Sequence, residues 1–180
     1  MKILWNNLLM TFDEIYYEHH KMVFNLALQY VQNIEDAEEI TQDVFIKVFD
    51  NIDSFNKQAS VKTWIYRISI NQSLDFIKAK NSQKRSFLSS IFSLNDEKFK
   101  FEPKNFNHPG IELEQKESYQ KIFDAINQLS DNQKTVIILM KIEDRSQAET
   151  AEIMNLNIKA LESLFQRAKK NLEIVINQKG

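Results

Sequence analysis

The sequence predicts an all-α protein built as two small helical domains joined by a flexible linker. The chain has 180 residues but only two glycines and two prolines, so long helices with few tight turns are expected. Apolar residues recur with helical spacing before and after residues 81–110, whereas that stretch is aperiodic and contains Pro103 and Pro109. Such a long aperiodic stretch is unusual inside one compact domain. We therefore expect domains at residues 1–80 and 111–180, with residues 81–110 as the linker.

Composition excludes several kinds of chemistry. The chain has no cysteine, so it can form no disulfide, no thiolate zinc site and no cysteine nucleophile. The three histidines are the adjacent pair His19 and His20 and the distant His108, without metal-ligand spacing. No glycine-rich phosphate-binding loop is present. We expect no cofactor, no metal site and no small-molecule substrate, and we interpret the histidine pair as a partly exposed helix surface without chemistry.

The N-terminal residues 1–10 are apolar but are interrupted by Asn6 and Asn7 and lack a small-residue cleavage site. They are interpreted as the lead-in to a helix and not as a signal peptide. No later segment approaches about eighteen uninterrupted apolar residues, the length of a membrane-spanning helix. The sequence therefore predicts no direct membrane insertion and a cytoplasmic location.

Residues 11–32 have the periodicity of a first helix, and residues 35–52 that of a second. The second helix has an acidic outer face opposite an apolar stripe formed by Ala37, Ile40, Val44, Val48 and Ile52, widened by Phe45 and Phe49. Ile46 points toward the acidic face. An apolar side chain among carboxylates favours a protein interface with a basic partner, although a solvated face with one stray isoleucine is also common.

After a loop at residues 53–60, residues 61–80 form a predicted third helix with two apolar arcs. One arc comprises Val61, Trp64, Ile65, Ile68 and Phe76, and the other comprises Tyr66, Ile70, Leu74 and Ile77. Between them runs a narrow polar strip of Thr63, Arg67, Asn71 and Lys78, so we expect other elements to pack on both sides of this helix. Aromatic rings beside arginine and lysine suit unpaired bases and phosphates, but Trp64 and Tyr66 can equally be core and boundary residues.

The C-terminal half is predicted to form helices at residues 111–129 and 130–142, the second capped by Ser130 or Asp131. Residues 146–172 then have the spacing of a helix-turn-helix, with small Ala151, turn residue Asn155 and apolar Leu161 at the positions that its packing requires. Ser146 and Glu149 form a predicted capping box. Helix-turn-helix spacings also occur in bundles that never bind DNA.

The last predicted helix is amphipathic. At 100° per residue its apolar arc comprises Leu161, Leu164, Phe165, Ala168 and Leu172, and the centre of the opposite arc comprises Lys159, Ser163, Gln166 and Lys170. Arg167 and Lys169 lie on the rims of the polar arc, and Glu162 is its one carboxylate. The short polar side chains suit base edges and the cations suit phosphates, which predicts a DNA-reading face.

The charge balance is not that of a protein that binds DNA unaided. Residues 1–80 carry 8 basic and 11 acidic side chains, net −3, and residues 111–180 carry 10 and 11, net −1. Phosphate neutralisation supplies most of the affinity in non-specific DNA binding. If the chain binds DNA, we expect a partner to supply much of that neutralisation.

With both halves in view, the chain resembles a bacterial RNA polymerase sigma factor of the extracytoplasmic-function (ECF) type. Three stretches carry the resemblance: EDAEEITQDVFIKVF, similar to the polymerase-binding helix; KTWIYRISINQSLDFIK, similar to the helix that opens and reads minus-ten DNA; and LSDNQKTVIIL with the helix-turn-helix and QRAKKNL, similar to the domain that reads minus-35 DNA. The chain departs from the family pattern at Asn155 (commonly Gly), Ala160 (often Thr) and Leu164 (in many members Arg).

The resemblance implies a function in transcription initiation without bond chemistry, with core RNA polymerase and promoter DNA as partners. Whether an anti-sigma factor also binds is left open. The implied polymerase-binding residues are Asp36, Glu38, Glu39, Gln42, Asp43 and Ile46. The implied minus-ten residues are Asn56, Lys62, Thr63, Trp64, Tyr66, Arg67, Asn71 and Lys78, and the implied minus-35 residues are Lys159, Glu162, Ser163, Gln166, Arg167, Lys169 and Lys170.

Two other classes of function remain. A two-domain helix-turn-helix regulator that acts without polymerase would explain residues 111–180, but it gives no role to the acidic helix or to the polar strip. A carboxylate-rich helical enzyme needs inward-facing acids with histidine partners, whereas the acids here face outward. Co-purification with core polymerase discriminates these, because only a sigma factor requires it.

Overall fold

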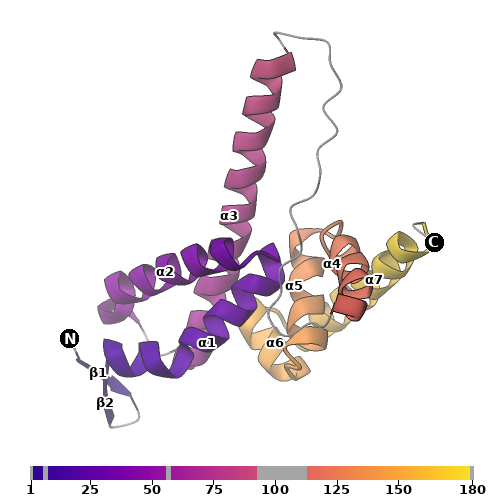
Figure 1. Cartoon of the computed structure of the whole chain (residues 1–180). Helices are drawn as coiled ribbons and strands as arrows, with labels where there is room; N and C mark the ends of the chain where they lie inside the picture. The colour runs from indigo at the N-terminus through magenta and orange to yellow at the C-terminus, as the bar shows by residue number, and fades with distance from the viewer. Residues whose placement is uncertain (1, 6–7, 56–57, 93–112, 179–180) are drawn as a thin grey trace.

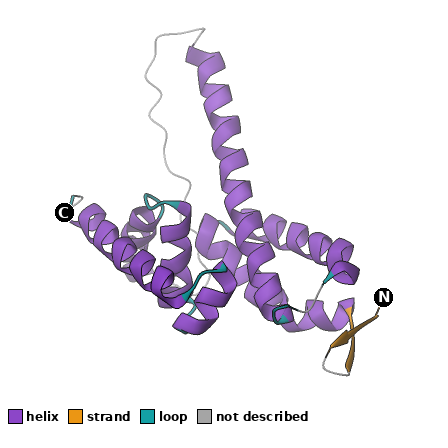
Figure 2. Cartoon of the chain, turned by 180° about the vertical axis from the view of Figure 1, so that it is seen from behind, coloured by secondary structure: helices purple, strands orange, loops and turns teal. Residues whose placement is uncertain are grey.

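The computed structural model describes residues 2–5, 8–55, 58–92 and 113–178, and these residues form an almost entirely helical protein (Figures 1 and 2). The all-α prediction is confirmed, with one short exception. Strands β1 (Lys2–Trp5) and β2 (Leu8–Thr11) pair in antiparallel fashion, with Lys2 opposite Thr11. Residues 2–5 and 8–11 therefore form a β-ribbon that leads directly into α1.

Three helices form the N-terminal domain: α1 (Phe12–Val31), α2 (Ile34–Asn51) and α3 (Val61–Phe92), with a short 3₁₀ turn (η1, Ile52–Ser54) after α2. Polar side chains set the boundaries. Thr11 and Glu14 form a capping box at the start of α1, and the Asn33 side chain accepts from the Asp36 backbone N–H at the start of α2. Between these helices Gln32 has φ 49°, which ends α1 in a left-handed residue.

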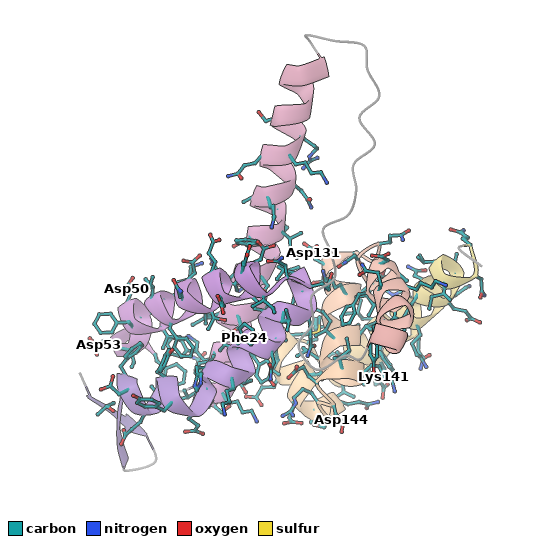
Figure 3. The ribbon with its side chains drawn as sticks, in the orientation of Figure 1. Phe24, Asp50, Asp53, Asp131, Lys141 and Asp144 are labelled. Atoms are coloured by element: carbon teal, nitrogen blue, oxygen red, sulfur yellow. The ribbon has the colours of Figure 1, made fainter. Side chains whose placement is uncertain are left out.

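The N-terminal core lies where α1, α2 and α3 meet. Its fully buried members include Ile15, Val23, Ile40, Val44 and Ile65. Phe24 of α1, labelled in Figure 3, packs against this core. Each aliphatic side chain of this size contributes about 1.5–3 kcal/mol when fully buried.

Helix α3 continues through Asn81 to Phe92, into the stretch predicted as linker. Its C-terminal part projects away from the rest of the protein (Figure 1). The remaining residues of the predicted linker, 93–110, lie outside the described residues.

The C-terminal domain comprises α4 (Leu113–Ile126), α5 (Asp131–Ile137), the π-helical turn η2 (Ile138–Ile142), α6 (Gln147–Met154) and α7 (Ile158–Asn177). Ser130 is the N-cap of α5, although its side chain makes no capping hydrogen bond. The core of this domain includes Phe123, Ile126, Val136, Leu161 and Ala168.

The two domains pack directly against each other. A third apolar cluster joins Leu26, Tyr30, Tyr66 and Ile70 from the N-terminal domain to Ile138, Leu139 and Ile153 from the C-terminal domain. In Figure 1 this contact lies where α1 and α3 meet α5 and α6. Within the part of the chain that the structure describes, no helix has the length and apolar character to cross a bilayer.

Candidate nucleic-acid interface and docking surfaces

The outer face of α2 presents most of the side chains predicted to bind a protein partner. Glu38, Glu39, Gln42 and Ile46 are exposed, with Ile46 retaining 58% of its accessible surface. The other two predicted residues are held within the domain. Asp36 forms an ion pair with Lys80, and the Asp43 carboxylate accepts a hydrogen bond of 2.7 Å from the Gln72 side chain.

An aromatic patch that the sequence analysis missed lies near this face. Phe49, predicted to widen the buried stripe, is 50% exposed, and Tyr16 and Tyr17 of α1 are 39% and 76% exposed. Phe49 lies one helical turn after Ile46 and makes an edge contact with Phe12 at 5.3 Å between ring centroids. Phe49 follows Ile46 by three residues, which is close to one helical turn. A helical wheel drawn from Ile46 therefore places Phe49 at the border of the outer face.

The prediction that α3 is packed on both sides is confirmed, and its two apolar arcs pack into different hydrophobic clusters. Val61 and Ile65, with Trp64, Ile68 and Phe76, pack into the core of the N-terminal domain. Tyr66, Ile70, Leu74 and Ile77 pack into the cluster that includes Ile138, Leu139 and Ile153 of the C-terminal domain. The second arc is thus the N-terminal domain's contribution to the contact between domains.

The first residues predicted to contact minus-ten DNA surround the start of α3. Thr63 is buried, and Ser60 accepts a hydrogen bond of 2.9 Å from its backbone N–H, so Thr63 has a structural role at the helix start. Lys62 is exposed, and Trp64 is half-buried with its ring 4.9 Å from that of Phe55. Asn56 lies outside the described residues.

Three further predicted minus-ten residues contact the C-terminal domain. The Arg67 guanidinium donates to the backbone carbonyls of Glu152 (2.6 Å) and Ile153 (3.2 Å). The Lys78 ammonium lies 3.1 Å from the Asp131 carboxylate, and Figure 3 shows Asp131 beside the base of the projecting part of α3. Tyr66 is 2% exposed. In this arrangement Tyr66 is buried and Arg67 is half-buried at the contact between the domains, whereas the Lys78 side chain remains 61% exposed.

Asn71 and Lys78 are the exposed members of the polar strip, and Asn71 lines a cleft between the domains. The cleft has a volume of ≈ 440 Å³. Arg67, Asn71 and Leu74 of α3 form one wall, and Asn132, Thr135, Met154 and Asn155 of the C-terminal domain form the other. The polar strip therefore faces the helix-turn-helix across a gap.

The C-terminal side of this contact includes a buried cation, Lys134, that the sequence did not reveal. Lys134 is 5% exposed, and its ammonium donates to the backbone carbonyl of Tyr30 (3.0 Å) and to the Asn127 side chain (2.6 Å). Burial lowers the pKa of Lys134 to about 8, partly offset by the nearby Asp131 carboxylate. The Tyr30 hydroxyl, whose pKa is raised by burial, donates to Thr135 Oγ1 at 2.8 Å.

The helix-turn-helix has the predicted local geometry. Ser146 and Glu149 form the capping box, Asn155 has φ 53°, and the Asn157 side chain accepts from the Ala160 N–H at 2.8 Å to start α7. Ala151 and Leu161 are buried where the two helices meet. Asn155 provides the left-handed turn that glycine commonly provides, because asparagine tolerates positive φ better than most residues.

The amphipathic division of α7 is as predicted. Leu161, Leu164, Phe165 and Ala168 are buried in the domain core. The seven residues of the predicted DNA-reading face are all exposed: Lys159, Glu162, Ser163, Gln166, Arg167, Lys169 and Lys170. Leu164, at a position where many family members have Arg, is 9% exposed and therefore belongs to the core of this domain. On the rim, the Lys169 ammonium lies 5.0 Å from the centre of the Phe165 ring.

The histidine pair differs from its prediction. His19 is 5% exposed, whereas His20 is half-buried, so the expectation of a partly exposed pair was wrong for His19. Burial lowers the pKa of His19, with Glu18 raising it and Lys62 lowering it further. His19 borders a second cleft of ≈ 370 Å³ between the domains, together with Lys62, Tyr66, Glu143 and Arg145. Among the described residues no group of three or more acidic or histidine side chains is placed to hold a metal.

Comparison with known proteins identifies both halves of the chain. The family model for sigma-70 region 2 matches residues 15–83, and that for sigma-70 region 4 matches residues 119–172. The ECF RNA polymerase sigma-E factor of Haemophilus influenzae is 27% identical over 164 residues, covering 90% of this chain and 85% of that protein. The RNA polymerase sigma factor SigV of Bacillus subtilis is also 27% identical over 164 residues, covering 89% and 88%.

Solved structures show the same fold. The sigma factor RpoE from Bartonella quintana, solved with the anti-sigma factor NepR, matches with a TM-score of 0.60 and 22% identity, covering 92% of this chain and 96% of that one. CnrH, solved with the cytosolic domain of CnrY, matches with a TM-score of 0.63 and 18% identity, covering 94% and 89%. The two matched regions, in this order and with this fold, show that the chain belongs to the sigma-70 family and is an RNA polymerase sigma factor of the ECF type.

Proposed function

We propose that this sigma factor docks on core RNA polymerase through the outer face of α2, reads the minus-35 element with α7 and holds the melted minus-ten strand with the first half of α3. One observation carries the proposal. The seven polar residues of α7 are all exposed while the apolar residues between them are buried in the domain core, which leaves one polar helix face free to enter a groove.

The docking surface is both acidic and apolar. Glu38, Glu39 and Gln42 surround Ile46, and the aromatic patch continues from Phe49. Carboxylates steer a basic partner toward the surface, while an apolar side chain that becomes buried on contact slows dissociation. This combination fits a positively charged surface of core polymerase.

At the minus-ten element the proposed role is binding and not catalysis. Unstacking a base costs a few kcal/mol, and a protein that binds the unstacked strand more tightly than the duplex shifts the equilibrium by that difference in affinity. Asn71 and Arg67 offer amide and guanidinium donors for bases and phosphates, and Lys62 adds a cation at the helix start. The Trp64 ring packs on the Phe55 ring and supports this surface from the side of the protein.

The charge of each half explains why core polymerase is needed. With net −3 on residues 1–80 and net −1 on residues 111–180, neither half can release many counterions from DNA. We expect the free chain to bind promoter duplex weakly at physiological salt and to bind it tightly only with core polymerase.

A mobility-shift titration tests the proposal. A pool of duplexes with randomised minus-35 and minus-ten elements is titrated with the protein alone, with core polymerase alone and with both. A specific shift is expected only with both, and transcripts should start from the retained sequences. Tight, sequence-specific binding by the free chain would instead support a helix-turn-helix regulator that acts without polymerase.

The comparison with RpoE, which was solved with an anti-sigma factor, extends the proposal to a protein inhibitor of this chain. Such an inhibitor would compete with core polymerase for the outer face of α2. Because promoter DNA is the proposed target, the proposed place of action is the cytoplasm.

A further inference from the structure

Positive charge in this chain is concentrated on one helix. Helix α3 carries six basic side chains and one acidic side chain, net +5, whereas the whole chain has a net charge of −2. The residues outside α3 therefore carry net −7 together. The charged residues of α3 are Lys62, Arg67, Lys78, Lys80, Lys84, Arg85 and the single carboxylate Asp75. The net charges of the two halves of the chain conceal this local excess.

The second half of α3 carries this charge away from the domain. Residues 76–92 contain four basic side chains and no acidic one. The family model for sigma-70 region 2 ends at residue 83, whereas α3 continues to Phe92, so Lys84 and Arg85 lie just beyond the matched region. Figure 1 shows this part of the helix projecting from the body of the protein. A cationic helix in this position is accessible to a polyanion.

Arg85 lies on the same face of α3 as the polar strip. At 100° per residue, Arg67, Asn71, Lys78 and Arg85 fall within an arc of about 40°, with Asp75 at its border. Asn71, Lys78 and Arg85 are exposed. From Asn71 to Arg85 the helix rises about 21 Å, which is the length of about six base pairs of duplex DNA. We call Lys78 and Arg85, which follow Asn71 along this face, the basic ridge.

Neither cation of the basic ridge is held by a buried contact. Within the part of the chain that the structure describes, Arg85 makes one hydrogen bond, from Nε to the carbonyl of Asn81 in its own helix (3.3 Å). The Lys78 ammonium lies 3.1 Å from the Asp131 carboxylate, but these side chains are 61% and 52% exposed, so solvent screens the ion pair and it contributes little. Both cations are therefore accessible to a second, more highly charged partner.

The side chains of the basic ridge suit phosphates and not unpaired bases. Residues 78–86 include lysine, arginine, asparagine, glutamine and serine but no aromatic residue, and stacking on unpaired bases requires aromatic rings. The start of α3 differs, because Trp64 and Tyr66 lie there. Cations on one helix face contact the DNA backbone without reading its sequence, and arginine pairs with a phosphate in bidentate fashion. The basic ridge therefore fits the backbone of duplex DNA.

The order of the chain indicates which part of the promoter this is. The first half of α3 is the proposed site for the melted minus-ten strand, and the end of α3 leads along the chain to the domain proposed to read the minus-35 element. The DNA between these two elements is duplex. A helix face that continues from the minus-ten site toward the upstream domain therefore fits the duplex next to the minus-ten element.

We propose that the projecting part of α3 is a further DNA-binding surface, on which Lys78 and Arg85 contact backbone phosphates of the duplex immediately upstream of the minus-ten element. This inference rests on the proposed function. It adds a contact that raises affinity for promoter DNA but carries no base specificity, and it assigns a role to Arg85, which belongs to none of the binding surfaces described above.

Two charge variants at adjacent positions test the basic ridge. Arg85→Gln and Lys84→Gln each remove one positive charge and keep a good helix former, but at 100° per residue Lys84 lies about 100° outside the arc that contains Arg85. Each variant is bound to core polymerase, and its affinity for a promoter retained from the randomised pool is measured between about 0.05 and 0.3 M salt. Affinity for core polymerase is measured separately without DNA.

Arg85→Gln should reduce the slope of log affinity against log salt concentration by about one and weaken promoter binding about eightfold at 0.1 M salt, which is the effect of one released counterion. Lys84→Gln should match the parent in both measurements, and the promoter-library profile of Arg85→Gln should equal that of the parent. Equal salt slopes for the two variants would overturn the proposal, and so would a changed base preference in Arg85→Gln.

A tethered cleavage reagent locates the DNA beside the basic ridge. The chain has no cysteine, so Arg85→Cys and Gln83→Cys each provide a single thiol, to which an iron chelate is attached before core polymerase is added. Gln83 is exposed and lies about 160° from Arg85 around the helix, so it is the matched control. The reagent at position 85 should cut the duplex within about six base pairs upstream of the minus-ten element, and the reagent at position 83 several-fold less. Cuts confined to melted DNA, or equal cutting from both positions, would contradict the proposal.

These measurements separate failure of this inference from failure of the proposed function. If the parent protein forms no sequence-specific promoter complex with core polymerase, the proposed function fails and the inference fails with it. If the parent forms that complex while Arg85→Gln and Lys84→Gln behave alike, the proposed function stands and the basic ridge alone is wrong. A loss of affinity for core polymerase in Arg85→Gln, measured without DNA, would place Arg85 against the polymerase and would also refute the contact with DNA.

Discussion

The hydroxyl of Tyr66 donates a hydrogen bond of 3.1 Å to the carboxylate of Glu143, and this bond joins α3 to the turn that precedes the helix-turn-helix. Burial and the neighbouring carboxylate both raise the pKa of Tyr66, so the phenol remains a donor at any physiological pH. A residue whose sequence context predicts contact with unpaired bases thus serves, in this structure, as a contact between domains.

The proposed contact between the polar strip of α3 and minus-ten DNA is tested most cleanly at Asn71, which is exposed. Asn71→Ala should leave the closed promoter complex intact and reduce permanganate reactivity of the minus-ten thymines by about 2- to 12-fold, the range for one hydrogen bond of about 0.5–1.5 kcal/mol. A premelted bubble template should rescue transcription. Failure of the bubble to rescue would point to a defect in folding or core binding.

Arg67→Ala serves as the comparison for Asn71→Ala because Arg67 also contacts the C-terminal domain. Losing a DNA contact should slow promoter opening, while losing the contact with Glu152 should favour separation of the domains. We expect a smaller net defect in opening than the loss of a phosphate contact alone would cause.

The docking surface is tested with Glu39→Lys and Ile46→Asp, since both side chains are exposed and project from α2. Each should weaken core binding while changing the free energy of unfolding by about 0.5 kcal/mol or less, as is usual at exposed sites. Surface plasmon resonance with immobilised core polymerase measures the affinity. Glu173→Lys on exposed α7 is the matched control, and a loss of affinity there equal to that of Glu39→Lys would place the docking surface elsewhere.

Asp43→Lys is expected to behave differently from Glu39→Lys. Because Asp43 accepts a hydrogen bond from Gln72 of α3, its reversal should lower both core affinity and the melting temperature of the N-terminal domain. A circular-dichroism melt beside the binding measurement separates the two effects, and an unchanged melting temperature would show that the Gln72 contact contributes little.

The recognition helix is tested by the contrast between Gln166 and Lys170, both exposed on α7. Gln166→Ala should cost about 1–3 kcal/mol on the preferred minus-35 sequence and relax specificity at one position. Lys170→Ala should weaken all sequences alike and reduce the salt slope by about one. A promoter-library profile for Gln166→Ala identical to that of the parent would indicate that this helix reads groove shape and backbone instead of base edges.

Acidification should destabilise the N-terminal domain through His19. Burial holds the pKa of His19 below the ordinary value of 6.5, so near and below that value the unfolded chain binds more protons than the folded chain. The free energy of unfolding should therefore fall as the pH drops from about 7 through 6.5 and below. Urea titrations across this range should show a shallower dependence for His19→Gln than for His20→Gln, and equal slopes would rule out His19 as the source.

How far the sequence predicts this structure depends on what each pattern reports. Helix periods report which side chains are buried, and they predicted both arcs of α3 and the two faces of α7. They do not report what covers a buried face. The arc of Tyr66 and Ile70 was therefore predicted as buried, while its partner, the C-terminal domain, was not identified.

Lys134 and His19 show the other limit. Each lies in a predicted helix, but Lys134 donates to the carbonyl of Tyr30 in the other domain, and His19 borders a cleft with Lys62 and Glu143. The pattern of a single helix contains no information about such distant neighbours. Local signals were more reliable at the helix-turn-helix. There Ser146, Asn155 and Asn157 cap helices through backbone groups only a few residues away in the chain. The assignments of individual side chains to polymerase and to DNA stay predictions.

The second arc of α3 has a further consequence for any fragment of this protein. If the chain is cut between its domains, Tyr66, Ile70, Leu74 and Ile77 lose the cover that Ile138, Leu139 and Ile153 provide. A contiguous apolar stripe on a free surface favours self-association, so an isolated N-terminal fragment should aggregate more readily than the whole chain. The same apolar stripe is exposed whenever the two domains separate. A chain whose domains have separated should therefore bring them together again once it is free in solution, because this contact covers the stripe.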